Sequence, residues 1–186
     1  AEPFPRMGAR NTPKVHRTIP LAPALVLANR EENRREDVEA LRAAGLDVLV
    51  TDPDTVPGAV AMIRELGVRL SASERAESLA AEIEAALALP APSRPLRVFV
   101  AVWKEPLMGL GAESYGHDLV ERAGATNVLA GRTRYPEVTL EEVAALRPDL
   151  VLLPDEPYPF GEPDAARFAG IAPVRVIDGR LLWWYG

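Results

Sequence analysis

Residues 23–51, with the sequence PALVLANREENRREDVEALRAAGLDVLVT, decide the fold. The run Ala24–Ala28 is short, continuous and apolar, which is typical of a buried strand in a parallel sheet. A helix is expected to follow, with Asn33 as its N-cap and Gly45 as its end. Asp47–Thr51 then predicts a second strand. Because a strand, a helix and a strand joined by short connections form a βαβ unit, we expect the two strands to pair in parallel.

The segment that opens this unit has a counterpart later in the chain. Pro23-Ala24-Leu25-Val26-Leu27 is matched by Pro148-Asp149-Leu150-Val151-Leu152, 125 residues on. In both places an acidic loop, a helix and another strand are expected to follow. His16 and Glu141 lie at the same offset ahead of the two motifs. A repeat of this length predicts two similar lobes, related by duplication or by approximate two-fold symmetry.

The chain between the two lobes is predicted to be helical. Val56–Leu66 has the pattern of a helix that Gly67 ends, and a capping box that starts at Ser71 predicts a longer helix over residues 71–89. At the usual rise per residue this helix would be roughly 28 Å long, which is enough to brace two lobes. The Pro-rich residues 90–96 follow as a stiff linker.

The sequence thus predicts an α/β protein of two lobes with mainly parallel sheets, bridged by a long backbone helix. The expected divisions are residues 1–70 for an incomplete N-terminal lobe, 71–89 for the bridging helix, 90–96 for the linker and 97–186 for the C-terminal lobe. In the C-terminal lobe we expect strands over Arg97–Trp103, Asp149–Leu153 and Val174–Ile177, and helices over Ser114–Ala123, Leu140–Leu146 and Pro163–Phe168. Ligands of open α/β sheets bind beyond the carboxyl ends of the strands, so the loops after Ala28, Trp103 and Leu153 are expected to line a cleft between the lobes.

The composition excludes several classes of protein. The chain has 21 Lys+Arg against 27 Asp+Glu and no Cys, so it offers no disulfide, no thiolate nucleophile and no clustered basic run for a nucleic acid. Its apolar runs are far shorter than the roughly 20 residues of a membrane-spanning helix. The sequence contains no HExxH motif, no GxSxG motif and no P-loop. We also expect no export signal within the chain.

Large aromatic residues fall at predicted strand ends and in loops. These residues are Trp103, Tyr115, Tyr135, Tyr158, Phe160 and Trp184. Flat side chains on loops suit a large flat ligand, since stacking buries much area at low entropic cost. The alternative is that each ring fills the core at a strand end. That alternative is less expected for Tyr158 and Phe160, because their Pro-rich acidic loop is polar.

Polar residues accompany these aromatics. Asp155 and Glu156 either bind a cation or a polar ligand, or lie in a solvated loop. Asn29, in the matching loop of the first lobe, is close enough to its strand end to point inward. His117, next to Asp118, either ligates iron or, as we expect of a lone histidine, is an ordinary surface or capping residue. Met108 is expected to pack rather than to ligate a metal. We therefore predict no metal site and no catalytic residue.

Four segments, in this order, carry a resemblance to a known family. They are residues 23–28 with the helix that follows, 98–108, 134–142 and 147–152. With them the chain resembles the class III periplasmic substrate-binding proteins, the helical-backbone receptors that deliver cobalamin, haem and ferric siderophores to ABC importers. The resemblance covers nearly the whole chain. It implies an extracytoplasmic protein that is not an enzyme, has no intrinsic cofactor, binds a metal chelate between its lobes and delivers it to a permease.

The resemblance also implies roles for particular residues. Tyr135 falls where the family has an aromatic that contacts the ligand, and Asn29 and Trp184 lie at or near other contact positions. Glu141 matches an acidic residue that docks onto arginines of the permease, and His16 stands where the first-lobe counterpart is usually acidic. The full set of expected ligand contacts is Trp103, Tyr135, Glu156, Tyr158, Trp184, Asn29, Met108 and Tyr115.

The two ends of the chain differ from the family pattern, which opens with a further strand and helix and closes with a further helix. We therefore expect an incomplete first lobe with an unprotected sheet edge, and exposed apolar surface at residues 181–185 unless a second copy of the chain covers it. Two rival hypotheses stay open. One is an enzyme on a doubly wound α/β fold that uses Asp155, Glu156 and Tyr158, and the other is a relative that binds only a partner protein.

Overall fold

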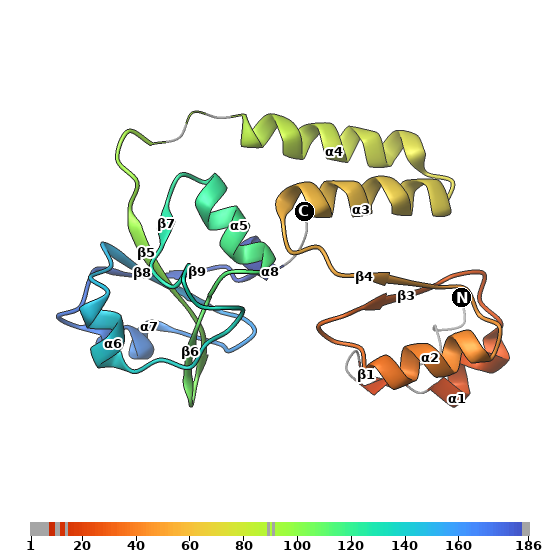
Figure 1. Cartoon of the computed structure of the whole chain (residues 1–186), viewed down its shortest axis with the longest axis horizontal. Coiled ribbons are helices and arrows are strands. Elements are labelled where there is room, and N and C mark those ends of the chain that lie inside the picture. The colour runs from red at the N-terminus through yellow and green to blue at the C-terminus, as the bar shows by residue number, and fades with distance from the viewer. Residues whose placement is uncertain (1–7, 10–11, 14, 89, 91, 184–186) are drawn as a thin grey trace. The chain divides into compact units, whose positions relative to one another are not determined.

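The computed structural model describes residues 8–9, 12–13, 15–88, 90 and 92–183. The chain divides between Asp52 and Pro53 into two compact units, each built of helices and strands (Figure 1). The predicted α/β class with mainly parallel sheets is confirmed. Helices α3 (Val56–Arg69) and α4 (Ser73–Leu87), which lie between the sheets in chain order, belong to the second unit. The four divisions expected from the sequence stay predictions.

The first unit contains the predicted βαβ arrangement. Its elements are β1 (Gly8–Ala9), β2 (Thr12–Pro13), α1 (Val15–Thr18), the 3-10 helix η1 (Ile19–Leu21), β3 (Val26–Asn29), α2 (Arg35–Ala43) and β4 (Val48–Thr51). β1 and β2 pair antiparallel, whereas β3 and β4 pair in parallel with Val26 opposite Val48. Val38 and Leu41 of α2 pack with Ala28 and Val48 in a small buried core. Parallel pairing after a helical crossover is thereby confirmed.

The start of α2 differs from the prediction. Arg34 rather than Asn33 is the N-cap residue. The Asn33 Oδ1 atom instead accepts a hydrogen bond of 2.7 Å from the backbone N–H of Asn29, so it closes the loop that precedes the helix. Arg34 forms an ion pair of 3.0 Å with Asp37 in the first turn, where a carboxylate also interacts favourably with the helix dipole. Gly45 follows the helix as predicted, with a φ of 82° that favours glycine.

In the second unit, α3 and α4 pack closely against each other. Helix α3 does not end at Gly67 as predicted but continues past it. A Cβ atom at Gly67 would lie 2.3 Å from the Cβ of Ala76, so this glycine lets the two helices approach. The capping box predicted at Ser71 is also wrong, because α4 begins after its N-cap residue Ala72, whose side chain makes no capping bond. With 15 residues, α4 is about 22 Å long rather than 28 Å.

The remainder of the second unit is a sheet with helices on both faces. Its elements are β5 (Arg97–Lys104), β6 (Leu107–Gly109), α5 (Tyr115–Arg122), β7 (Thr126–Asn127), α6 (Leu140–Ala145), β8 (Leu150–Pro154), α7 (Glu162–Ala165), the 3-10 helix η2 (Ala166–Phe168), β9 (Val174–Ile177) and α8 (Arg180–Trp183). The strand order is β6-β5-β8-β9, with β7 also paired to β5. β7, β8 and β9 run parallel to their neighbours, and only β6 is antiparallel.

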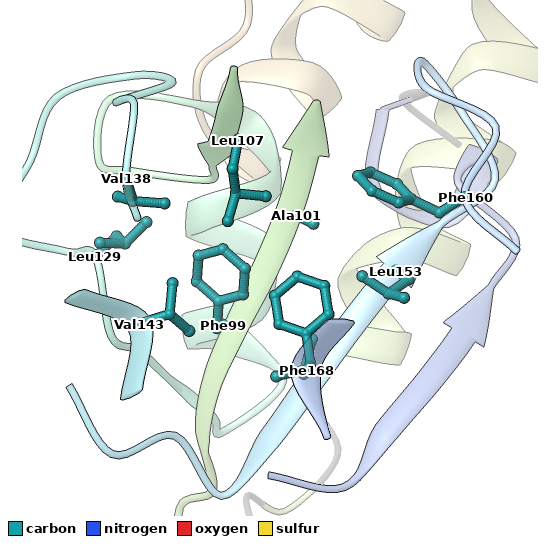
Figure 2. Close-up of a cluster of buried hydrophobic side chains, with 10 residues drawn as sticks. Phe99, Ala101, Leu107, Leu129, Val138, Val143, Leu153, Phe160 and Phe168 are labelled. Atoms are coloured by element: carbon teal, nitrogen blue, oxygen red, sulfur yellow. The ribbon is translucent and has the colours of Figure 1, made fainter. Parts of the chain in front are cut away.

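Alternation along β5 divides the core between the two faces of this sheet. Phe99 and Ala101 face a cluster that includes Val143 of α6 and Phe168 of η2, and Figure 2 shows the rings of Phe99 and Phe168 side by side. Their ring centroids lie 5.9 Å apart. The opposite face, with Val98, Val100 and Val102, packs against α5 and α8. Since successive residues of a strand point to opposite faces, one buried strand supports both layers of helices.

The internal repeat predicted from the sequence is present in the backbone. In the first unit Val26 of β3 lies opposite Val48 of β4, and in the second unit Val151 of β8 lies opposite Val174 of β9. Each pair of strands is parallel, and a helix precedes each first strand. The helix before β8 is α6, whose predicted capping box at Thr139 is confirmed. The two units therefore share a helix-strand-helix-strand core.

Candidate functional site

The aromatic side chains of Trp103 and Tyr158 meet at the carboxyl end of β5. Trp103 follows Phe99 and Ala101 on the same face of the strand, but it lies beyond the packed core and is 41% exposed. The Trp103 and Tyr158 ring centroids are 5.4 Å apart, and the planes meet edge to face at 78°. This geometry is favourable for aromatic pairs. Because part of the indole remains exposed, it is available to a ligand.

The loop after β8 carries Tyr158 and is anchored by Phe160. The Tyr158 and Phe160 centroids are 4.6 Å apart. Phe160 is only 4% exposed and belongs to the core cluster shown in Figure 2. The expectation that this loop is too polar for Phe160 to be buried is therefore wrong. Asp155 and the two prolines of the loop are exposed, whereas Phe160 is buried in the core and Tyr158 is half-buried beside it.

An ion pair lies directly beside this aromatic pair. Lys104, the residue after Trp103, places its Nζ atom 2.7 Å from Asp164 Oδ1, and the Asp164 side chain is only 10% exposed. Asp164 Oδ2 accepts a second hydrogen bond, of 3.0 Å, from the backbone N–H of Gly161. The hydrogen bond from Lys104 and then that from Gly161 lower the pKa of Asp164, and the bond to Asp164 raises the pKa of Lys104. Both groups are therefore charged at neutral pH.

The same loop is tied to the segment that follows β9. Asp155 Oδ1 accepts a hydrogen bond of 2.7 Å from the backbone N–H of Gly179. The indole N–H of Trp183 donates to the backbone carbonyl of Glu156. Gly179 is needed here, because a Cβ at that position would lie 2.6 Å from the Glu156 side chain. Asp155 and Glu156 thus help to fix the loop, a role that the sequence did not indicate.

A second aromatic pair lies on the other face of the sheet. The rings of Tyr135 and Trp183 have centroids 6.4 Å apart and planes at 71°. Both residues pack against the cluster that contains Val100 and Val102, whereas Tyr158 packs against the opposite cluster. Trp183 was not among the expected contacts. It is adjacent in sequence to Trp184, which was expected but lies outside the described residues.

The other expected ligand contacts, Met108, Tyr115 and Asn29, lie on three different elements of the fold. Met108 of β6 lies opposite Trp103 in the β5–β6 register, so the two side chains share one face of the sheet. Tyr115 is the first residue of α5 and is half-buried. Asn29 belongs to the first unit, and its Oδ1 atom accepts a hydrogen bond of 2.9 Å from the backbone N–H of Glu31. The structure therefore brings Trp103, Met108 and Tyr158 together around one strand end.

The two residues expected to dock a permease occupy equivalent positions. His16 is the second residue of α1 and Glu141 is the second residue of α6, and both are exposed. Hydrogen bonds from its own backbone N–H and from the Thr139 hydroxyl lower the pKa of Glu141. At neutral pH the second unit thus presents a carboxylate in the first turn of α6.

His117, the histidine of the second unit, is hydrogen-bonded to the buried side chain of Asn127. His117 Nδ1 lies 3.1 Å from the amide nitrogen of Asn127, which also donates to the Leu110 carbonyl. The imidazole is thus part of the packing of α5. Among the described residues, no group of three His, Cys, Asp or Glu side chains is arranged to hold a metal ion. In the same part of the chain, none of the helices has the length and apolar character needed to cross a membrane.

Comparison with known proteins identifies a family with this sequence pattern. The family described as "Periplasmic binding protein" matches residues 3–156. The vitamin B12-binding protein of Salmonella typhimurium is 29% identical over 144 residues, which is 75% of this chain and 54% of the relative. That of Pectobacterium atrosepticum is 26% identical over 149 residues, again 75% of this chain and 53% of the relative. The chain thus spans about half the length of these curated relatives.

Solved structures agree on the fold. The periplasmic heme-binding protein BhuT, in complex with two hemes, aligns with a TM-score of 0.80 and 23% identity over 100% of this chain and 78% of that one. The heme-binding protein HutB of Vibrio cholerae aligns with a TM-score of 0.79 and 20% identity over 96% of this chain and 76% of that one. These likenesses concern the fold, and the family is one of binding proteins rather than enzymes. The chain therefore belongs to the periplasmic binding protein family.

Proposed function

We propose that this chain binds a flat metal-bearing macrocycle, a corrinoid or haem, as the extracytoplasmic binding component of an ABC importer. The observation that carries the proposal is the Trp103–Tyr158 pair, a partly exposed aromatic surface at the carboxyl end of β5. Parallel α/β sheets bind ligands at this edge, and aromatic faces bury flat ligands efficiently. Relatives named for vitamin B12 and heme binding support this ligand class. Ferric siderophores, which are metal chelates but not flat macrocycles, are the alternative ligand that we consider.

The surroundings of the surface favour binding over catalysis. The rival hypothesis of an enzyme on this fold assigns acid or base roles to Asp155, Glu156 and Tyr158. Asp155 instead accepts a backbone hydrogen bond from Gly179, and Tyr158 is packed between Trp103 and Phe160. These contacts suit a fixed recognition surface, because a general acid or base needs access to its substrate within hydrogen-bonding distance.

The experiment is a spectroscopic titration. Ferric haem and cyanocobalamin are each added to the purified chain, and binding is followed by the shift of the Soret or corrin band and by quenching of tryptophan fluorescence. Saturable binding of one ligand at one site per chain supports the proposal. If neither ligand nor a panel of ferric siderophores shifts its spectrum or the melting temperature, the proposal is wrong, since a ligand bound only by the folded chain must stabilise it.

Delivery to a permease is a separate part of the proposal. The ionised Glu141 and its counterpart His16 occupy the exposed first turns of α6 and α1. A carboxylate there can pair with arginines of a partner through charge-assisted hydrogen bonds. Glu141→Gln should reduce stimulation of the importer's ATPase by the loaded chain and leave the Kd for the ligand unchanged. A loss of ligand affinity in this variant would contradict the docking role.

A further inference from the structure

We propose that the Lys104–Asp164 ion pair positions the ring of Tyr158 against Trp103, so that the aromatic surface is formed before the ligand arrives. Lys104 and Asp164 are then positioning residues of the binding site. The inference rests on the proposed function for its significance, although the geometry that it describes belongs to the chain without ligand. The two residues lie 60 positions apart, and their pairing joins the end of β5 to the start of α7.

The ion pair acts on the loop between β8 and α7, residues 155–161, which carries Tyr158. Near its first end the loop is held by the hydrogen bond from Gly179 to Asp155. At its second end Asp164 holds the Gly161 N–H with one oxygen and Lys104 with the other. Lys104 directly follows Trp103 on β5. The Lys104–Asp164 ion pair therefore holds the end of the loop close to the indole that Tyr158 contacts.

The Lys104 ammonium group also contacts the tyrosine. Its Nζ atom lies over the Tyr158 ring, 5.9 Å from the ring centroid. The ammonium group therefore lies between the Asp164 carboxylate, with which it pairs, and the Tyr158 ring. Since Trp103 meets Tyr158 edge to face, a displaced phenol would lose this geometry.

Burial makes the pair sensitive to the loss of one partner. The Asp164 side chain is 10% exposed and that of Lys104 29% exposed, so neither charge is fully hydrated. Removing one partner of a buried pair leaves the other charge without compensation, which favours movement of its segment toward water. Arg64, which pairs with both Glu77 and Glu84, provides a control, because its two partners are 62% and 52% exposed and stay hydrated when it is removed.

A different role for Lys104 would be direct contact with an anionic group of the ligand. The two roles predict opposite effects for Asp164→Asn, which keeps an oxygen to accept from Gly161 but removes the charge that holds Lys104. If Lys104 positions the tyrosine, Asp164→Asn weakens binding as Lys104→Met does. If Lys104 binds the ligand directly, Asp164→Asn frees the ammonium group and strengthens binding of haem, whose propionates are anionic.

The test uses the full chain labelled with 5-fluorotryptophan, which gives one ¹⁹F resonance for each of the 3 tryptophans. Trp103→Phe assigns the resonance of Trp103. Tyr158→Leu then gives the chemical shift that this resonance takes when the neighbouring ring is absent. Spectra of Lys104→Met, Asp164→Asn, Lys104→Arg and Arg64→Met are recorded without ligand, and the Kd for haem and for cyanocobalamin is measured for each variant.

We expect Lys104→Met and Asp164→Asn to move the Trp103 resonance toward its position in Tyr158→Leu, and Arg64→Met to leave it unchanged. Lys104→Arg should restore the wild-type shift, at least in part. Both charge-removing variants should weaken binding of whichever ligand the wild type binds by about fivefold to tenfold, the factor that corresponds to the net contribution of one ordinary hydrogen bond.

An unchanged Trp103 resonance in both Lys104→Met and Asp164→Asn would overturn the inference, as would tighter haem binding by Asp164→Asn. These results differ from a failure of the proposed function. In that case the wild-type chain binds neither haem nor cyanocobalamin, while the ligand-free spectra still decide whether the ion pair positions Tyr158.

Discussion

Truncation of Trp103 is the most direct test of the proposed binding surface. The side chain lies at the end of β5 and is 41% exposed, with its buried part in contact with Tyr158. A tryptophan has a surface of about 250 Å², so about 100 Å² of the indole is available for a ligand to cover. At about 25 cal/mol per Å² this area corresponds to at most about 2.5 kcal/mol of binding free energy.

The expected effect of Trp103→Ala follows from this ceiling. A ligand covers only part of the free indole area, so we expect a loss of about 1 to 2.5 kcal/mol, or an increase in Kd of about 5-fold to 70-fold. The assay is the absorbance titration with haem or cyanocobalamin. Trp103→Phe, which keeps an aromatic face, should lose less.

The control is Leu96→Ala. Leu96 is an apolar residue with a similar exposed fraction, 46%, and it precedes the amino end of the same strand. If the ligand binds at the carboxyl end of β5, this variant keeps the wild-type Kd. A Kd for Trp103→Ala within twofold of the wild-type value, with both variants folded by circular dichroism, would refute the assignment of this surface.

Two further predictions concern the stability of the second unit. Gly67→Ala places a methyl group 2.3 Å from the Cβ of Ala76. The overpacking should cost about 1 to 3 kcal/mol, and the higher helix propensity of alanine offsets about 1 kcal/mol of this. Urea titrations should therefore show a free energy of unfolding that is lower by up to about 2 kcal/mol. In a double-mutant cycle, adding Ala76→Gly should remove part of this clash between the helices. The control Gly131→Ala, whose added methyl group would meet no atom within 4 Å, should be nearly neutral. Equal effects of Gly67→Ala and Gly131→Ala would contradict the close approach of the helices. In acid, Asp164 should contribute to unfolding, because its pKa falls below the usual 3.8 through its hydrogen bonds with Lys104 and Gly161: the stabilisation is complete above that value and is lost as pH falls through the lowered pKa. The free energy of unfolding below pH 3.8 should therefore depend less on pH in Asp164→Asn than in the wild type, and identical slopes would contradict this assignment.

The sequence predicted the strands better than the ends of the helices. The apolar run at residues 98–103 was recognisable as a strand, because it is short and rich in β-branched and aromatic residues, which suit both faces of a buried strand. Helix ends depend on a choice between local caps and tertiary contacts. Gly67 has the local character of a helix stop, but the gain from packing against Ala76 keeps it inside α3. Strand β6 was missed because three residues carry too little periodicity to predict a strand.

The candidate site could be predicted only in part, for a related reason. Trp103 and Tyr158 were identified because Trp103 ends a predicted strand and Tyr158 lies in the loop after another, and parallel strands bring their carboxyl ends to one edge. Lys104 and Asp164 were not, because no local pattern indicates that two charges distant in sequence will pair. The same holds for Trp183, whose contact with the Glu156 carbonyl depends on the register of β8 and β9.

The pairing of charges beside the aromatic surface bears on how the surface recognises its ligand. The loop of Tyr158 is fixed by Asp155, by Phe160 and by the Lys104–Asp164 pair, and each of these contacts is made within the chain itself. A loop ordered in advance loses little conformational entropy when it binds, so more of the contact free energy appears as affinity. Since the ammonium and carboxylate groups already satisfy each other, what the strand end offers a ligand is mainly the flat face of an indole. Such a surface selects for shape and aromatic area, and discrimination between a corrinoid and haem must then come from other contacts at the periphery of the ligand.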